Sequence, residues 1–519
     1  MAFASVATPS IHAQESEAFV LLLASGDTIS VERFTRTGAR LDGELLMTSA
    51  GARFTYTATL APDATVPRLE NALRPAAADR RAPPSQSAVI TFQGDSAIVV
   101  VAQGDRSVTQ RLGSRRGALP FINPSFALVE QLVRRAFAIG GDSVSLPIFL
   151  VQGGQTLPVT IRRITRDSVV VDLAGGAPAR LSVGTAGEIT GGAVPAQGLR
   201  IVRVRGLPEA AMHSEPVVYD APAGAPYTAE EVRVPTADGF VLAGTLTLPR
   251  GADRPVPALV TITGSGLQDR DGRIPLVRDY ALFRQITDTL SRHGVAVLRM
   301  DDRGFGASGG DASRATSADF ADDIRAGLRY LRTRGEIDGA RLGLIGHSEG
   351  GIIAPMIAAR DSSLRGIVLM AAPGWSGRRV IESQNRYLLE SSPQLSARQR
   401  DSLLQLSMRM VDSAGASTPW LGYFQSYDPL ATARRVRVPV LILHGATDRQ
   451  VTAEQAEELA RAMLAGGNPD VTVRVFESTN HLFLRDSVGN WAQYGSLPER
   501  TVRPVVLGTL LEWVSSRFR

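Results

Sequence analysis

The chain has 519 residues, 56 basic and 51 acidic side chains, a formal net charge of +5 and no cysteine. Its length allows about two to four domains with cores of their own, and the missing cysteines exclude disulfides and thiol chemistry. The basic residues are scattered arginines rather than a basic stripe, which argues against nucleic-acid binding, and the longest apolar run, residues 18–24, is too short for a transmembrane span.

The first residues are small, apolar and uncharged up to Ala13. They resemble the end of a secretory signal with a cleavage site near Ala13, although the basic start and the long apolar centre are missing. Residues 1–15 are therefore expected to be a leader or a disordered terminus. We expect an exported protein, periplasmic or secreted, and a cytoplasmic location stays open.

Residues 16–205 consist mainly of short alternating runs, such as 28–34 and 41–48, separated by Gly-Asp and Gly-Gly turn signals. Period-two alternation with dense turns predicts an antiparallel β-rich domain, interrupted by one helix over 124–138. Residues 16–205 contain no set of side chains with the pattern of a catalytic site. Substrate docking, shielding of an active site and dimerisation all stay open as the role of this domain.

A proline- and alanine-rich stretch, residues 206–230, is predicted to be a semi-rigid linker. After it, a hairpin is followed by alternating strands and helices, among them a strand over 258–263, a helix over 276–293 and a strand over 295–300. This order predicts that residues 231–519 form an α/β domain, whose mostly parallel sheet is covered by helices on both faces.

The most informative motif is Gly346-His347-Ser348-Glu349-Gly350, between a strand-like run and a small-residue helix. A G-x-S-x-G in this context is typical of a nucleophile elbow. Glycines at both flanks allow the tight turn that lifts the Ser348 hydroxyl above the sheet. The following helix directs free N–H groups toward the same point. Ser348 is the predicted nucleophile.

A serine nucleophile needs a base, and the chain has only six histidines. His481 lies in a turn-like stretch after the strand over 471–476, where a base is expected. His347 is predicted to face away from the Ser348 hydroxyl, and His444, at the end of a strand, is predicted to be structural. The remaining two internal histidines and the one in the leader have no supporting context.

The third group should be a carboxylate that orients the imidazole. Asp448 lies in the loop after the strand over 438–443. The order Ser348, Asp448, His481 is the chain order of an α/β-hydrolase triad. All three positions fall at carboxyl ends of predicted strands, where open α/β sheets bind ligands.

On these residues, the region from about 228 to 519 resembles the α/β-hydrolase-fold serine esterases, similar to the serine aminopeptidase-like and dienelactone hydrolase-like branches. The resemblance implies an oxyanion loop at residues 263–268, with backbone donors from Ser265 or Gly266 (Leu267 being an alternative) and from Glu349. The loop departs from the common His-Gly start, because Thr263-Gly264 stands there.

The segment 301–308 resembles the D-x-R-G-x-G-x-S loop of these hydrolases and is expected to brace the site. Residues 268–272 have the D-x-D-G spacing with which a calcium-binding loop begins, but no glutamate stands at the closing position of such a loop. We therefore expect these charged residues to brace the oxyanion loop. No metal and no cofactor are predicted.

A segment of helical periodicity interrupts the α/β pattern after its sixth strand, at about 376–436. This insertion is expected to be a helical cap, the alternative being a decoration packed away from the site. Its methionine, leucine and aromatic content favours a pocket for an apolar acyl or aryl group.

The sequence therefore predicts a serine hydrolase that cleaves small-molecule carboxylic esters through an acyl-enzyme. Two alternatives stay open: an aminopeptidase or other amide hydrolase on the same triad, and a non-catalytic binding protein on a hydrolase scaffold. The physiological substrate and the oligomeric state are left open.

Overall fold

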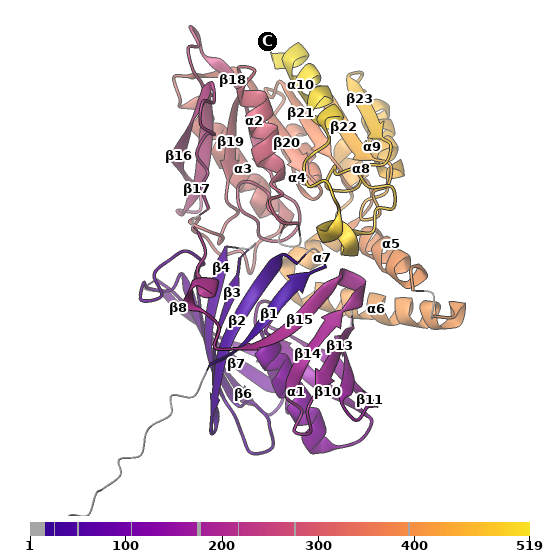
Figure 1. Cartoon of the computed structure of the whole chain (residues 1–519). Coiled ribbons are helices and arrows are strands. Elements are labelled where there is room, and N and C mark those ends of the chain that lie inside the picture. Colours follow the sequence, from indigo (N-terminus) through magenta and orange to yellow (C-terminus); the bar gives the residue numbers. More distant parts are fainter. Residues whose placement is uncertain are drawn as a thin grey trace, which may run out of the picture. The chain divides into compact units, whose positions relative to one another are not determined.

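The computed structural model describes residues 16–518, apart from 25, 49–50, 105, 174–177, 216, 275–276 and 393–394. The expected leader therefore lies outside the described residues. The chain divides into two compact units, Met1–Pro216 and Val217–Arg519 (Figure 1). Among the described helices, none is long and apolar enough to cross a bilayer.

The described part of the first unit forms one 15-stranded sheet, in the order β8-β7-β6-β5-β4-β3-β2-β1-β15-β14-β13-β12-β11-β10-β9. Neighbouring strands are antiparallel except β9 and β10, which run parallel. The first strand pairs with the last, Glu17 opposite Arg205. The strands are β1 Glu17–Leu23, β2 Thr28–Thr37, β3 Arg40–Met47, β4 Ala52–Thr59, β5 Arg68–Pro75, β6 Gln86–Gln93, β7 Ser96–Gln103, β8 Arg106–Gly113, β9 Leu119–Phe121, β10 Ser143–Leu150, β11 Gln155–Thr165, β12 Ser168–Leu173, β13 Ala179–Val183, β14 Ile189–Val194 and β15 Leu199–Arg205.

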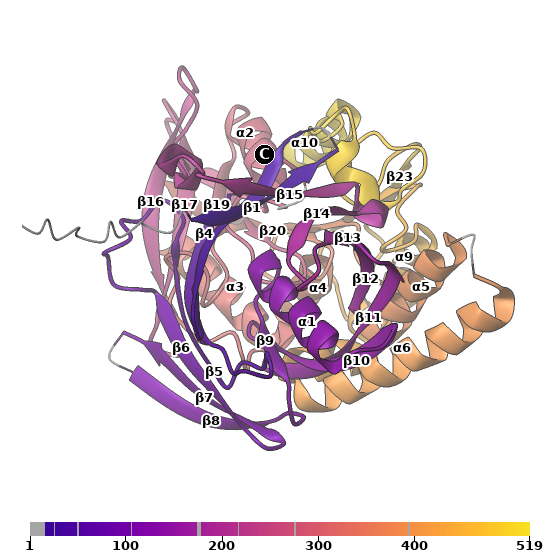
Figure 2. The same ribbon diagram turned by 60° about the horizontal axis from the view of Figure 1, so that its bottom comes forward.

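This sheet curves around a single described helix, α1 (Phe126–Ile139), which buries most of its surface against it (Figure 2). The buried carboxylate of Glu32 on β2 accepts hydrogen bonds from Tyr56 Oη, Ser125 Oγ and the N–H of Ala127 at the start of α1. Tyr56 reaches Glu32 across β3 because Gly43 has no side chain: a Cβ there would lie 2.1 Å from the tyrosine ring. These contacts fix the beginning of the helix inside the curve.

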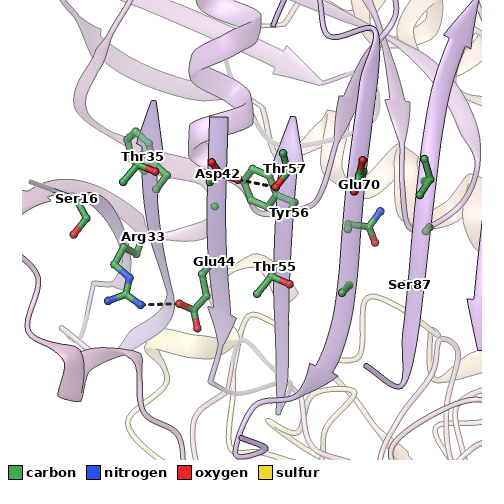
Figure 3. A pocket seen from close by; sticks show the side chains of 16 residues that line it. Ser16, Arg33, Thr35, Asp42, Glu44, Thr55, Tyr56, Thr57, Glu70 and Ser87 are labelled. Carbon is green, nitrogen blue, oxygen red and sulfur yellow. Dashed lines mark hydrogen bonds and ion pairs between the residues drawn. The ribbon is translucent and has the colours of Figure 1, made fainter. Parts of the chain in front are cut away.

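A polar cavity of about 580 Å³ lies on the face of β2 to β6. Its lining includes the ion pair Arg33–Glu44 and the hydrogen-bonded pair Asp42–Thr57 (Figure 3). The lining residues include no histidine and none of the catalytic groups expected from the sequence. The first unit thus carries an open polar groove rather than a second triad among its described residues.

The described part of the second unit has an eight-stranded sheet in the order β16-β17-β19-β18-β20-β21-β22-β23. The β16–β17 and β17–β19 pairs are antiparallel, and the other neighbours are parallel. The strands are β16 Tyr227–Pro235, β17 Val241–Pro249, β18 Val256–Ile262, β19 Ala296–Met300, β20 Ile337–His347, β21 Gly366–Met370, β22 Val440–Gly445 and β23 Val471–Phe476. Because β20 to β23 are parallel neighbours, the loops after them lie along one edge.

Helices cover both faces of this sheet, and each face has its own buried core. Consecutive residues of β20 show the alternation: Leu344 packs in a core with α3 (Ser317–Arg332), α4 (Gly350–Ala358) and α9 (Glu454–Ala465), whereas Ile345 packs with α2 (Leu282–Ser291) and α10 (Pro504–Phe518). Fully buried strands of this kind form from continuous apolar runs.

Two predicted boundaries differ from the structure. The helix expected over 276–293 begins only at Leu282, because Asp279 has a φ of 62° and the preceding residues form turns in which Tyr280 is buried. The strand β16 begins at Tyr227, inside the stretch expected to be linker. The expected insertion contains four helices, α5 Gly377–Glu390, α6 Ala397–Ser417, α7 Pro419–Ser426 and α8 Pro429–Ala433.

Candidate active site

Ser348 lies in the turn between β20 and α4 and adopts a φ of 54°, in the left-handed region that side chains rarely occupy. The turn requires both flanking glycines. A Cβ at Gly346 would lie 2.0 Å from the carbonyl oxygen of Gly350, and one at Gly350 would lie 2.2 Å from the carbonyl oxygen of Ile262. The geometry is that of a nucleophile elbow, with the serine partly exposed at its tip.

His481 and Asp448 meet in the loops after β23 and β22. The distance between His481 Nδ1 and Asp448 Oδ2 is 2.7 Å, and both side chains are buried. The other oxygen, Asp448 Oδ1, accepts the N–H groups of Gln450 and Val451 at 2.9 Å each. Burial alone would raise the pKa of Asp448, but His481 and His444 hold this pKa well below its usual range. The carboxylate is therefore ionised, and Nδ1 of His481 is its donor.

His347 connects the turn at Ser348 to His481, a contact that the sequence did not predict. Its Nε2 lies 2.9 Å from the carbonyl oxygen of His481, and the two imidazole centroids are 4.8 Å apart. Burial, and then the neighbouring His481 ring, lower the pKa of His347 to about 3. A neutral ring facing a carbonyl donates from Nε2, so His347 positions the backbone of His481 beside Ser348.

Two further buried groups lie around His481 and Asp448. His444 Nε2 lies 2.8 Å from the carbonyl oxygen of Val451 and 3.5 Å from Asp448 Oδ2, so this histidine supports the carboxylate loop. The N–H of His481 donates to the Tyr494 hydroxyl at 3.3 Å. Nothing in the sequence pattern indicated Tyr494, which lies in a short 3-10 helix, Trp491–Ser496, between β23 and α10.

The expected oxyanion loop lies against Ser348. A Cβ at Gly264 would lie 3.2 Å from Ser348 Cβ. Asp302 holds the two ends of this loop: Thr263 Oγ1 donates to it at 2.7 Å and the Gln268 N–H at 2.8 Å. Ser265 and Gly266, the expected donors, are exposed between these ends. At the elbow, the Ser348 N–H is already bonded to the Met370 carbonyl oxygen at 2.9 Å.

Arginine–carboxylate pairs brace the loops around this edge. Arg270 donates to both oxygens of Asp301 at 3.0 and 2.9 Å, and Arg303 donates to both oxygens of Asp323 at 2.7 and 2.8 Å. Asp271, the second aspartate of the calcium-like motif, is fully buried and paired with Arg299. These bidentate contacts match the bracing role expected for both segments. Among the described residues, no group of three or more potential ligands could hold a metal ion.

The four-helix insertion contacts the loops of all three candidate catalytic residues. Trp420 Nε1 of α7 donates to Glu349, directly after Ser348, at 2.9 Å. Gln384 Nε2 of α5 donates to the carbonyl oxygen of Gln450, in the Asp448 loop, at 3.0 Å. The Tyr387 ring of α5 lies 5.1 Å from that of Trp491, in the chain segment after His481.

Comparisons with known families place their matches on this unit. The family described as Serine aminopeptidase, S33, matches residues 276–414, which include Ser348. The Prolyl oligopeptidase family matches residues 411–497, which include Asp448 and His481.

Among curated relatives, Esterase EstD of Thermotoga maritima is 28% identical over 248 residues, 47% of this chain and 58% of that protein. Dipeptidyl aminopeptidase BIII of Pseudoxanthomonas mexicana is 26% identical over 268 residues, 49% of this chain and 35% of that protein. The chain thus spans about three fifths or less of the length of these relatives. A solved structure of the Pyrococcus furiosus esterase Pf2001 is 18% identical, covers 59% of this chain and 97% of its own, and has a TM-score of 0.41.

The second unit is an α/β-hydrolase-fold domain of the serine esterase-like kind, as its resemblances indicate. A large antiparallel sheet precedes it in the chain.

Proposed function

We propose that this protein is a serine hydrolase that cleaves carboxylic esters, with Ser348 as nucleophile, His481 as base and Asp448 as the residue that orients the imidazole. The observation that supports the proposal is the 2.7 Å bond between His481 and an ionised, buried Asp448, with the His481 ring 4.8 Å from that of His347, the residue before a left-handed Ser348. The similarity to Esterase EstD supports the ester class.

In this mechanism, Asp448 keeps the Nδ1 proton of His481 in place, so that Nε2 is free to accept the proton of the Ser348 hydroxyl. The serine oxygen then attacks the acyl carbon, and the N–H of Glu349 with one from Ser265 or Gly266 stabilises the oxyanion. The imidazolium returns its proton to the leaving alcohol, and an acyl-enzyme remains. Water, activated by His481, releases the acid and restores the serine.

The four-helix insertion is proposed to be a cap over this site, because it contacts the neighbourhood of each proposed triad residue. Its apolar content favours esters with an apolar acyl or aryl group. The first unit is proposed to be a separate domain that contributes none of the three catalytic side chains.

Amide hydrolysis is the second candidate, because both matched families are described as peptidase families. The same triad performs both reactions, so the discrimination lies in the substrate.

A panel of p-nitrophenyl esters of rising acyl length, run beside aminoacyl-anilides with wild type and Ser348→Ala, tests the proposal. We expect ester hydrolysis that depends on Ser348 and exceeds anilide hydrolysis. Faster Ser348-dependent cleavage of the anilides would identify an amide hydrolase. No turnover of either class, together with no reaction of Ser348 with a fluorophosphonate, would identify a non-catalytic protein.

A further inference from the structure

The side chain of Glu349 has a position that its proposed backbone role does not explain. It directly follows Ser348 and is only 2% exposed. Its Oε1 accepts a hydrogen bond of 2.6 Å from Ser317 Oγ, at the start of α3, and one of 2.9 Å from Trp420 Nε1, in α7. One carboxylate oxygen therefore joins the elbow, a sheet-covering helix and the insertion.

A negative charge at this position is unfavourable for the proposed reaction. An anion develops on the substrate oxygen near the Glu349 N–H, and a buried carboxylate in the same residue opposes it electrostatically. A neutral side chain would therefore favour the chemical step unless the carboxylate has another function. Its two hydrogen-bond donors indicate what that function is.

The helix α7 packs on the sheet domain through two aromatic side chains, Trp420 and Phe424. The Trp420 ring stacks on Phe424, with centroids 5.3 Å apart and planes at 9°. Phe424 is 7% exposed and belongs to the core that contains α3 and α4. A Cβ at Gly377, the first residue of α5, would lie 2.2 Å from the Phe424 ring. Movement of α7 therefore displaces the start of α5 as well.

The long helix α6 is anchored much less firmly. Leu403 and Leu406 are 40% and 49% exposed, and Met408 is its best buried apolar side chain among those described. The insertion is held at several points: α8 packs on α9 and α4, α5 reaches the Asp448 loop, and α7 reaches the elbow through the bond from Trp420 to Glu349.

The second oxygen of Glu349 is not used by Ser317 or Trp420. Oε2 is buried and has no hydrogen-bond partner among the described residues. Glu349 lines a cavity of about 30 Å³ together with Thr263, Gly264 and Asp302. This volume suits one ordered water, which would satisfy Oε2. The carboxylate thus lies between the insertion on one side and the loop that is proposed to bind the oxyanion on the other.

We propose that Glu349 is a positioning residue that docks α7 onto the nucleophile elbow through Trp420, and that this contact determines how large an acyl group the site accepts. The acyl-size part rests on the proposed ester hydrolysis. In this proposal the apolar side of α7, which carries the Trp420–Phe424 stack, is the surface against which long acyl chains bind. Acetyl groups are too short to use it.

The test compares three variants that change single polar contacts. Trp420→Phe keeps the aromatic stack and removes the N–H donor. Glu349→Gln removes the charge but keeps an oxygen that accepts from Ser317 and Trp420. The matched control is Trp375→Phe, because Trp375 Nε1 also donates to a carboxylate, Glu458, at 3.1 Å, but on α9 instead of the elbow.

The activity readout is the ratio of kcat/KM for p-nitrophenyl octanoate to that for p-nitrophenyl acetate. Loss of a hydrogen bond to a buried carboxylate predicts a fall in this ratio of about tenfold or more in Trp420→Phe, mainly through KM for the octanoate. Trp375→Phe should keep the wild-type ratio. Glu349→Gln changes a residue whose N–H is proposed to bind the oxyanion, so its absolute rates should change for both esters while their ratio stays at the wild-type value. A ratio that is unchanged in Trp420→Phe, or that falls equally in the control, overturns the proposal.

Amide hydrogen exchange of the same proteins tests the docking without any substrate. Residues 419–426 should exchange faster in Trp420→Phe than in wild type, Glu349→Gln or Trp375→Phe. Equal exchange in all four proteins overturns the docking role. Faster exchange in a protein that hydrolyses no ester would retain the docking role and refute the proposed function, so the two failures are distinguishable.

Discussion

His347, the residue before the proposed nucleophile, places its Nε2 2.9 Å from the carbonyl oxygen of His481, the proposed base. Ser348 and His481 belong to loops 133 positions apart in the sequence, and this bond joins the two loops beside the reacting atoms. Because burial and His481 hold the pKa of His347 near 3, the bond persists without a change of charge across the neutral range.

Replacing this histidine should misplace the base without changing any proposed catalytic group. His347→Phe keeps a ring and removes the donor, which costs about 1 kcal/mol and hence about fivefold in kcat. The measurement is kcat on p-nitrophenyl acetate. The control is His213→Phe, because the His213 side chain is 68% exposed. Equal activities of the two variants would contradict the positioning role.

Asp448→Asn should retain the fold and lose about 10³–10⁴ in kcat. The asparagine oxygen can still accept the N–H groups of Gln450 and Val451, which leaves the amide NH₂ facing His481 Nδ1. Two donors then face each other, and the imidazole changes to the tautomer that cannot accept the serine proton. Asp361→Asn, in a turn before β21 at the opposite edge of the sheet, is the matched control and should remain active. Near-normal turnover of Asp448→Asn would show that another carboxylate orients the base.

Asp302 should make the folded protein less stable as the pH rises. Burial, and to a smaller extent the carboxylates of Asp301 and Glu349, raise the pKa of this carboxyl to about 8. Between about pH 4 and pH 8 the folded state therefore holds a proton that the unfolded state lacks, and the free energy of unfolding falls with pH. The stabilisation of the folded state by protonated Asp302 is fully present below the pKa of the unfolded state. It is lost as the pH rises through the pKa of the folded state, about 8.

Asp302→Asn removes this proton linkage while keeping an acceptor for the Gln268 N–H. The difference in denaturation midpoint between pH 5 and pH 8 should therefore be smaller in the variant than in the wild type. Asp253→Asn, an exposed change of the same charge, controls for the net charge of the protein. An unchanged difference in Asp302→Asn would mean that this carboxyl is ionised throughout the range.

The second unit should fold and hydrolyse a small ester without the first, provided that its leading segment is kept. The Tyr219 ring lies 4.2 Å from the guanidinium of Arg270, and Arg284 donates to the carbonyl oxygens of Val218 and Asp220. A fragment of residues 217–519 should therefore be more stable than one of residues 223–519, as measured by thermal unfolding. A folded, monodisperse 217–519 fragment with no activity on p-nitrophenyl acetate would mean that the first unit helps to build the site.

The sequence predicted most of the α/β pattern because its strands are continuous apolar runs bounded by turns, such as residues 258–263. It also predicted the elbow, since only glycines fit at positions 346 and 350. Strands β5 and β14 gave no such pattern. The first is largely polar, RLENALRP, and the second contains two glycines, so both are defined by pairing with their neighbours.

The candidate triad could be proposed from motif order, but its surroundings could not. The contacts of His347 with His481 and of Trp420 with Glu349 join residues 134 and 71 positions apart, and neither pair has a local signature. The contact of Tyr494 with the His481 N–H likewise depends on the tertiary fold and has no local signature. Such contacts depend on the packing of distant loops, which periodicity and spacing do not encode.

The most direct test of the central claim is covalent labelling of the wild-type protein with a fluorophosphonate, followed by peptide mass spectrometry, beside turnover of Ser348→Ala. We expect one labelled residue, Ser348, in the wild type, and in Ser348→Ala no labelling and a loss of about 10⁴-fold or more in turnover. Labelling of a different serine, or substantial esterase activity in Ser348→Ala, would contradict it.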